Sequence, residues 1–295
     1  MPELRKLNDF ATLKGQAIVL RQKTSQTLTK THVFKGAIET ITALNSDGAA
    51  IYVATEATEN AASDAICWLG LDGVIGAAYA WPFKKPYIRA KKTRIWPFPT
   101  DPQQPDQFLQ KPHPLILGAI VLDEAKRRGL IPLHTTPQEV FEFVIDESLD
   151  IGPLKRKAEE AISNNLQKAQ ATEAVRAIRT RLIVKSGPHK DALEKIRQHC
   201  FYLGDSLFRD GFLARNANIP FIHAQYGKTV ADEDRDTHNR AKRLLFRVTG
   251  WNRTLMGLTQ EAGQLSELTD LIEPHLVCRD SLQDLQVFLG RAHTM

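Results

Sequence analysis

Two acidic residues, five positions apart, are the best candidates for chemistry in this sequence. Asp205 follows Gly204 at the end of the apolar run 200–203, and Asp210 lies about one helical turn further along. We expect the run to form a buried strand and a helix to begin at about Leu207. Both carboxylates can then face one cation, and Mg2+ favours such oxygen ligands. The spacing therefore predicts a magnesium site at the carboxyl end of this strand.

Two further polar side chains follow predicted strands. Thr55 comes directly after the run 51–54, and Lys185 comes directly after the run 181–184. The carboxyl ends of parallel strands meet at one edge of a sheet, so we expect these side chains to converge with the two carboxylates. A hydroxyl and an ammonium group can bind phosphoryl oxygens, while carboxylates hold Mg2+ against them. The set predicts a site for a phosphoryl group.

Each assignment has a competing interpretation. Thr55 is also a good N-cap for the helix expected next, and the two carboxylates are also compatible with a cap and an exposed helix acid. Among the lysines we place Lys185 first and Lys190 second. Lys111 comes third because it lies too far before Gly204 for a single βα step.

The elements that must position these residues alternate between strand and helix. Helices are expected at 34–48, 57–69 and 189–198, and strands at 49–54, 74–80, 181–184, 200–203, 219–222 and 275–278. This βα alternation predicts an α/β fold with a mainly parallel sheet.

The middle of the chain breaks the alternation. Prolines crowd residues 81–115, so we expect a loop or an excursion from the sheet there, followed by helices at 115–128, 137–148 and 155–179. We therefore divide the chain into four parts. They are an N-terminal helical or cap remnant (1–33), a first core region (34–83), a Pro-rich loop with a helical insertion (84–180) and a second core region (181–295).

Aromatic and basic residues alternate within the Pro-rich loop. The aromatic residues are Trp81, Phe83, Trp96 and Phe98, and the cations are Lys84, Lys85, Arg89, Lys91, Lys92 and Arg94. Such a set can stack nucleic-acid bases. The interpretation we prefer is that the rings form the apolar underside of a loop with a solvated basic rim, so we expect no nucleic-acid partner.

The composition is that of an ordinary globular protein: 42% of the 295 residues are hydrophobic, 25% are charged, and the net charge is +5. The three cysteines lie far apart, which excludes a disulfide scaffold and a Cys-x-x-Cys metal site. We find no apolar signal core at the N-terminus and no run long enough to cross a bilayer. We therefore expect a cytoplasmic protein without a membrane partner. The residues indicate no oligomeric state.

The segments that carry the candidate residues resemble the haloacid dehalogenase (HAD) superfamily of hydrolases, most of which are Mg2+-dependent phosphatases. Residues 34–58 look like the family's helix, strand and Ser/Thr segment, and residues 202–227 look like its acidic metal-binding segment. Residues 246–251 and 273–289 resemble the tail of one bacterial subgroup. The resemblance covers about 34–96 and 181–290. It implies a three-layer α/β/α sandwich with a mainly parallel sheet and a helical insertion.

The resemblance also implies roles for the candidate residues. Thr55 would bind the transferred phosphoryl group, Lys185 would stabilise its charge, and Asp205 would ligate Mg2+ with the support of Asp210. The lysine alternatives remain Lys190 and Lys111, because Lys111 begins a Lys-Pro-His-Pro run that also looks like the family's lysine segment. We assign Glu56 and Ser206, which neighbour Thr55 and Asp205, to substrate binding.

One departure from the family concerns the nucleophile. The family carries an Asp-x-Asp pair at the end of a first strand, where the first Asp attacks the phosphoryl group. No such pair precedes Thr55, where the acids are Glu3, Asp9, Glu39 and Asp47. Either a segment is missing from this sequence or the catalytic carboxylate has been lost, and we favour the first explanation.

The function that we expect is Mg2+-dependent hydrolysis of a small phosphate ester through an aspartyl-phosphate intermediate, with a nucleophile that is not present in this sequence. The alternative is a catalytically inactive HAD-like domain that binds a phosphorylated ligand, a protein or nucleic acid.

Overall fold

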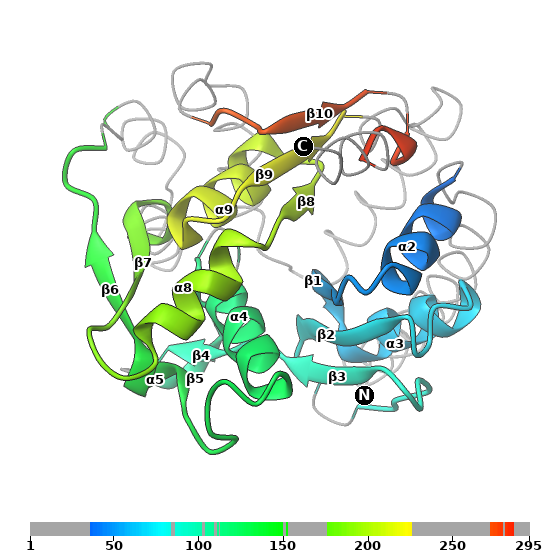
Figure 1. Ribbon diagram of the computed structural model, residues 1–295, viewed down its shortest axis with the longest axis horizontal. Helices are drawn as coiled ribbons and strands as arrows, with labels where there is room; N and C mark the ends of the chain where they lie inside the picture. The colour runs from blue at the N-terminus through cyan, green and yellow to red at the C-terminus, as the bar shows by residue number, and fades with distance from the viewer. Residues whose placement is uncertain are drawn as a thin grey trace, which may run out of the picture.

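The computed structural model of the chain describes residues 36–83, 86–101, 104–108, 111, 113–149, 152, 176–225, 272–279 and 281–285. They form a mixed α/β structure with interleaved helices and two three-stranded parallel sheets (Figure 1). The predicted α/β class is therefore confirmed. Two predictions lie wholly or mostly outside the described residues: the N-terminal segment of residues 1–33 and the helix at 155–179.

The first sheet has the strand order β1 (Ile51–Thr58), β2 (Ile75–Trp81), β3 (Arg94–Pro97), and all pairings are parallel. Helix α2 (Ala37–Ser46) precedes β1, and helix α3 (Glu59–Trp68) connects β1 to β2. The β-branched and aromatic residues of β1 favour a strand. Thr58 ends this strand and caps α3, because its hydroxyl oxygen accepts a hydrogen bond from the Ala61 N–H at 3.4 Å.

The second sheet has the order β10 (Leu276–Cys278), β9 (Phe221–Ala224), β8 (Tyr202–Gly204), again with parallel pairing. A π-helical turn, η1 (Leu207–Gly211), and helix α9 (Phe212–Ala217) connect β8 to β9. Asn218 ends α9 in the left-handed conformation with φ of 54°, which asparagine tolerates better than most residues. The strands predicted from the apolar runs are thus confirmed with small shifts of their bounds.

The helix predicted at 137–148 is wrong. Only α5 (Pro137–Val140) is helical, and the chain continues as β6 (Phe141–Ile145), which pairs antiparallel with β7 (Thr180–Val184). The aromatic and β-branched residues of β6 fit a pleated strand better than a helix. Strand β7, which we expected to join the parallel sheet, instead lies in this separate ribbon and leads into helix α8 (Lys190–Gln198).

The Pro-rich stretch 81–115 contains more regular structure than the sequence predicts. It supplies β3, which extends the first sheet, and the two short antiparallel strands β4 (Thr100–Asp101) and β5 (Gln104–Phe108). Pro97 is the last residue of β3, and an edge strand tolerates proline there because no further strand needs its missing N–H.

Helix α4 (Leu115–Arg127) lies at the centre of the molecule, between the first sheet and helix α8 (Figure 1). Its apolar residues form one hydrophobic core with residues of β2, β7, α8 and α9. Two tyrosines fasten it to the sheet: the Tyr52 hydroxyl donates to Glu124 at 2.7 Å, and the Tyr79 hydroxyl donates to Asp123 at 2.8 Å. A stretch that the sequence places in the insertion thus contributes to the core.

Within the described residues, no helix combines the length and the apolar character that a membrane span requires. All three cysteines are free thiols, and Cys278 is buried.

Candidate functional site

The carboxyl end of β8 carries the acidic segment. At Gly204 an added Cβ would lie 2.3 Å from the Cβ of Asp210, so only glycine lets Asp210 fold back over the end of the strand. Two hydrogen bonds from Ser206 stabilise the turn between Gly204 and Asp210. The Ser206 carbonyl accepts from the Asp210 N–H at 2.9 Å, and the Ser206 hydroxyl oxygen accepts from the Arg209 N–H at 3.1 Å. Glycine at 204 and serine at 206 thus place Asp210 beside β8.

Asp210 forms a buried ion pair with Lys111. The Lys111 Nζ lies 2.8 Å from Asp210 Oδ1, and the two side chains are only 11% and 8% exposed. Tyr202 completes the cluster: its hydroxyl accepts from Lys111 at 2.7 Å and donates to Asp210 at 2.9 Å. The second carboxylate oxygen accepts from the Ser206 N–H at 3.2 Å. Hydrogen bonds therefore satisfy the buried charges, as an interior ion pair requires.

The pKa values of the two carboxyl groups shift in opposite directions. Burial alone would raise the pKa of Asp210, but the Lys111 ammonium group and the hydrogen bonds from Lys111 and Tyr202 outweigh it and hold that pKa below the usual range. Desolvation and the neighbouring charge of Asp210 raise the pKa of Asp205. Asp210 thus stays ionised, while Asp205 takes up a proton or a cation more readily.

The carboxyl end of β1 lies beside this segment. Glu56 forms an ion pair with Arg209 of η1. This ion pair links the end of β1 to the end of β8. The Thr55 hydroxyl oxygen accepts from the Ala57 N–H at 3.1 Å. Thr55 lies within β1, three residues before its end, and not directly after the strand as predicted. It does not cap α3, because Thr58 does, so the N-cap interpretation of Thr55 is also wrong.

The structure does not bring Lys185 and Lys190 to this cluster. The Lys185 Nζ donates to the Gln138 carbonyl of α5 at 2.6 Å, and Lys190 is the exposed first residue of α8. Figure 1 shows α5 on the side of the molecule away from the turn after β8. Of the three candidate lysines, Lys111 is the one that contacts the acidic segment.

Sequence reasoning also misses Tyr202 and Arg209. The apolar run accounts for Tyr202 as a strand residue, but Tyr202 lies two positions before Gly204, so both residues belong to the same face of β8. That alternation is a usable signal for a hydroxyl beside Asp210. The pairing of Arg209 with Glu56 joins distant segments, and no local pattern indicates it.

The described residues contain no cluster of three or more His, Cys, Asp or Glu side chains arranged to hold a metal ion. The carboxylates available at this site are Asp205 and Asp210. His223 of β9 faces the backbone here, with its Nε2 at 3.3 Å from the Asp205 carbonyl oxygen.

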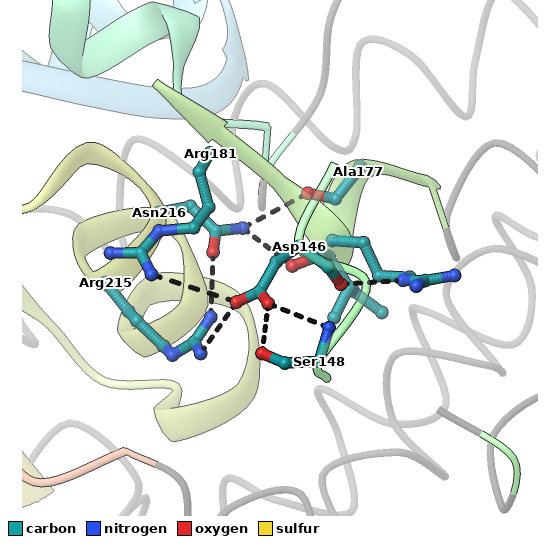
Figure 2. Close-up of polar contacts among 8 residues, drawn as sticks. Asp146, Ser148, Ala177, Arg181, Arg215 and Asn216 are labelled. Atoms are coloured by element: carbon teal, nitrogen blue, oxygen red, sulfur yellow. Dashed lines mark hydrogen bonds and ion pairs between the residues drawn. The ribbon is translucent and has the colours of Figure 1, made fainter. Parts of the chain in front are cut away.

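A second polar cluster lies between the β6–β7 ribbon and α9 (Figure 2). Asp146 accepts from the Ser148 hydroxyl at 2.5 Å and from Arg215 at 3.1 Å, and its carboxylate lies 3.8 Å from Arg181. The Asn216 amide donates to the carbonyls of Ala177 and Ile178 at 3.2 and 2.8 Å. The hydrogen bond from Ser148 and the Arg215 charge lower the pKa of Asp146 despite its burial. These contacts fasten α9, and with it η1, to the ribbon.

Comparison of the chain with models of protein families, with curated proteins and with solved structures finds no match.

Proposed function

We propose that the site formed by the ends of β1 and β8 binds a phosphate ester and hydrolyses it with the help of Mg2+, as in a HAD-like phosphatase. The observation that carries the proposal is the buried ion pair between Lys111 and Asp210. This ion pair joins two segments that resemble parts of the family. The Lys-Pro-His-Pro run resembles its lysine segment, and the acidic segment resembles its metal-binding segment. The two parallel sheets with interleaved helices are compatible with the family's three-layer α/β/α sandwich.

The donors at the site suit a phosphoryl group. An ammonium group has three N–H donors. Among the described residues, Tyr202 and Asp210 accept two of those of Lys111, and the third is available to a phosphoryl oxygen. The hydroxyl oxygens of Thr55 and Ser206 accept from backbone N–H groups. Their hydrogens can therefore be donated to a substrate, and we assign both residues to phosphate binding.

The two carboxylates suit Mg2+, which often takes one or two carboxylates and completes its shell with water and substrate oxygens. Burial and the neighbouring charge of Asp210 raise the pKa of Asp205, and a bound cation would offset both effects. We assign Asp205 to direct ligation and Asp210, held by Lys111, to support. When bound, Mg2+ would neutralise charge on the phosphoryl oxygens.

The nucleophile is assigned to none of the described residues. Attack through an aspartyl-phosphate needs a free carboxylate near the phosphorus. Glu56 is paired with Arg209, Asp210 is paired with Lys111, and Asp205 has the metal role.

Binding of inorganic phosphate in the presence of Mg2+, measured by calorimetry, tests the assignment of the lysine. We expect Lys111→Gln to weaken binding by about tenfold or more, as for the loss of a hydrogen bond from a charged group, and Lys185→Gln to leave it unchanged. The double variant Lys111→Gln/Asp210→Asn keeps the pair neutral and serves as a folding control. Loss of binding in Lys185→Gln alone would contradict the assignment of Lys111.

Turnover of an aryl phosphate with Mg2+ tests the chemistry. The 295-residue chain is compared with a version preceded by any upstream in-frame segment that ends in Asp-x-Asp. Turnover in the extended version, lost in Asp205→Asn, supports the hydrolase. Phosphate binding without turnover in both versions contradicts it and favours a phospho-ligand binding domain.

A further inference from the structure

The structure divides the aromatic residues of the Pro-rich loop into two groups. Phe98 is buried, and Trp81 packs on it edge to face with ring centroids 6.0 Å apart. In contrast, the exposed fractions of Tyr87, Phe83 and Trp96 are 70%, 48% and 42%. The apolar underside that the sequence favours therefore accounts for two of the rings and leaves three in solvent.

The backbone that carries the exposed rings is held in place by side chains of neighbouring elements. Within α3, Asn60 accepts from the Tyr87 N–H at 2.9 Å and Ser63 accepts from the Arg89 N–H at 2.8 Å. Asp72 accepts from three consecutive N–H groups, those of residues 91–93, at 2.8 to 3.0 Å. Residues 87–93 are thus held in place before any partner binds, which lowers the entropy cost of binding.

The charges of the loop are of one sign. Residues 82–97 contain six Lys or Arg residues and no Asp or Glu. Four of these cations, Arg89, Lys91, Lys92 and Arg94, are exposed, and none of the four forms an ion pair with a carboxylate among the described residues. Two acids contact the loop, and both accept from its backbone N–H groups: Asp72 from residues 91–93, and Glu59 from Phe83 at 2.9 Å.

We propose that Phe83 and residues 86–93 form a binding surface for single-stranded nucleic acid along α3, on which Phe83 and Tyr87 stack bases and Arg89, Lys91 and Lys92 contact phosphates. The combination favours this partner because single strands offer both a polyanionic backbone and free base faces. A duplex hides the base faces, and an acidic protein segment supplies charge without a series of flat rings. The surface is independent of the proposed phosphatase site.

The experiment measures the fluorescence anisotropy of labelled oligo-dT and oligo-U of about 12 nucleotides, a length within the range that one small domain covers. We expect binding that weakens steeply between about 50 mM and about 200 mM salt, because phosphate contacts release counterions. Phe83→Ala/Tyr87→Ala should weaken binding by about tenfold or more, since stacking of each base contributes about 1–3 kcal/mol. Both side chains are exposed, so the variant keeps its core.

A second variant and its matched control test the charge. Lys91→Gln/Lys92→Gln should lower the salt slope of log K by about 1.4, which corresponds to two single-strand phosphate contacts. Lys195→Gln/Arg279→Gln removes two exposed charges elsewhere and should change neither affinity nor slope.

Four outcomes would overturn the proposal. The first two are no binding at about 50 mM salt, where such contacts are strong, and equal weakening by the control variant. The other two are no effect of the aromatic variant and equally tight binding of poly-glutamate. The last two would assign the loop to polyanions in general or to an acidic protein.

Discussion

The residue on which the site depends most is Asp210. Its charge is buried, and three donors from Lys111, Tyr202 and the Ser206 backbone compensate for the water that it loses. Asp205, five residues earlier, is more exposed, and its partial burial and the like charge of Asp210 outweigh the interactions that favour its ionised form. Two chemically identical side chains therefore make opposite contributions to stability.

We expect opposite effects from the two neutral substitutions. Asp210→Asn leaves Lys111 buried without its counter-charge and should cost about 3 kcal/mol of unfolding free energy or more. Asp205→Asn removes a repulsion and should raise the unfolding temperature slightly in metal-free buffer while abolishing stabilisation by Mg2+. Thermal unfolding with and without Mg2+ measures both.

The pH dependence follows from the same two pKa directions. The lowered pKa of Asp210 gives stability that is present above the ordinary Asp range and is lost as the pH falls through the folded-state pKa. The raised pKa of Asp205 acts in the opposite direction, so its destabilising effect sets in as the pH rises through its own folded-state pKa. Wild type and Asp205→Asn should therefore converge in acid, and a constant difference at all pH values would contradict the raised pKa.

At the scale of elements, the sequence predicts what is local. The apolar runs next to Gly48, Gly73 and Gly204 predict strands β1, β2 and β8, because glycine at a turn marks where a strand begins or ends. One missed element, β6, follows a real helix start: the Glu139 carboxylate accepts from the Thr136 N–H at 2.5 Å. This capping pattern suggests a long helix, whereas pairing with β7, 35 or more residues away, decides the conformation.

The candidate site shows the same difference between local features, which the sequence predicts, and contacts between distant segments, which it does not. Asp205 and Asp210 can be found because their spacing and their position after a strand are local features. Lys111 ranks third on sequence because 99 positions separate it from Asp210, and helix α4, which packs in the shared core, brings the two segments together. The distance along the chain is therefore a poor guide to the distance in space.

One element-scale prediction concerns the contact of the β6–β7 ribbon with α9. Asp146→Ala removes the acceptor for Ser148 and Arg215 and should cost about 2 kcal/mol, as expected for partly buried donors left without a partner. Glu147→Ala is the matched control, because this neighbouring carboxylate is 80% exposed although it pairs with Arg179. Its loss should cost less than about 1 kcal/mol. Urea titrations compare the two, and equal costs would show that the ribbon is not fastened through Asp146.

On the scale of the whole molecule, contacts link the two parallel sheets to each other. Helix α4 joins their cores, and the ion pair between Glu56 and Arg209 joins their carboxyl ends. We expect Arg209→Leu to loosen both strand ends together while global stability changes by about 1 kcal/mol or less, since the pair is partly exposed. Hydrogen exchange should then accelerate in residues 54–58 and in 205–211. Acceleration in only one of the two segments would show that the pair does not couple the sheets.

The close approach of Asp210 to Gly204 also restricts how this protein can evolve. Any side chain at position 204 would occupy the space of the Asp210 carboxylate and push it away from Lys111. A lineage that replaces Gly204 therefore gains nothing by keeping the other two residues, because a displaced carboxylate leaves a buried ammonium group unpaired. Gly204, Asp210 and Lys111 should be inherited together or lost together.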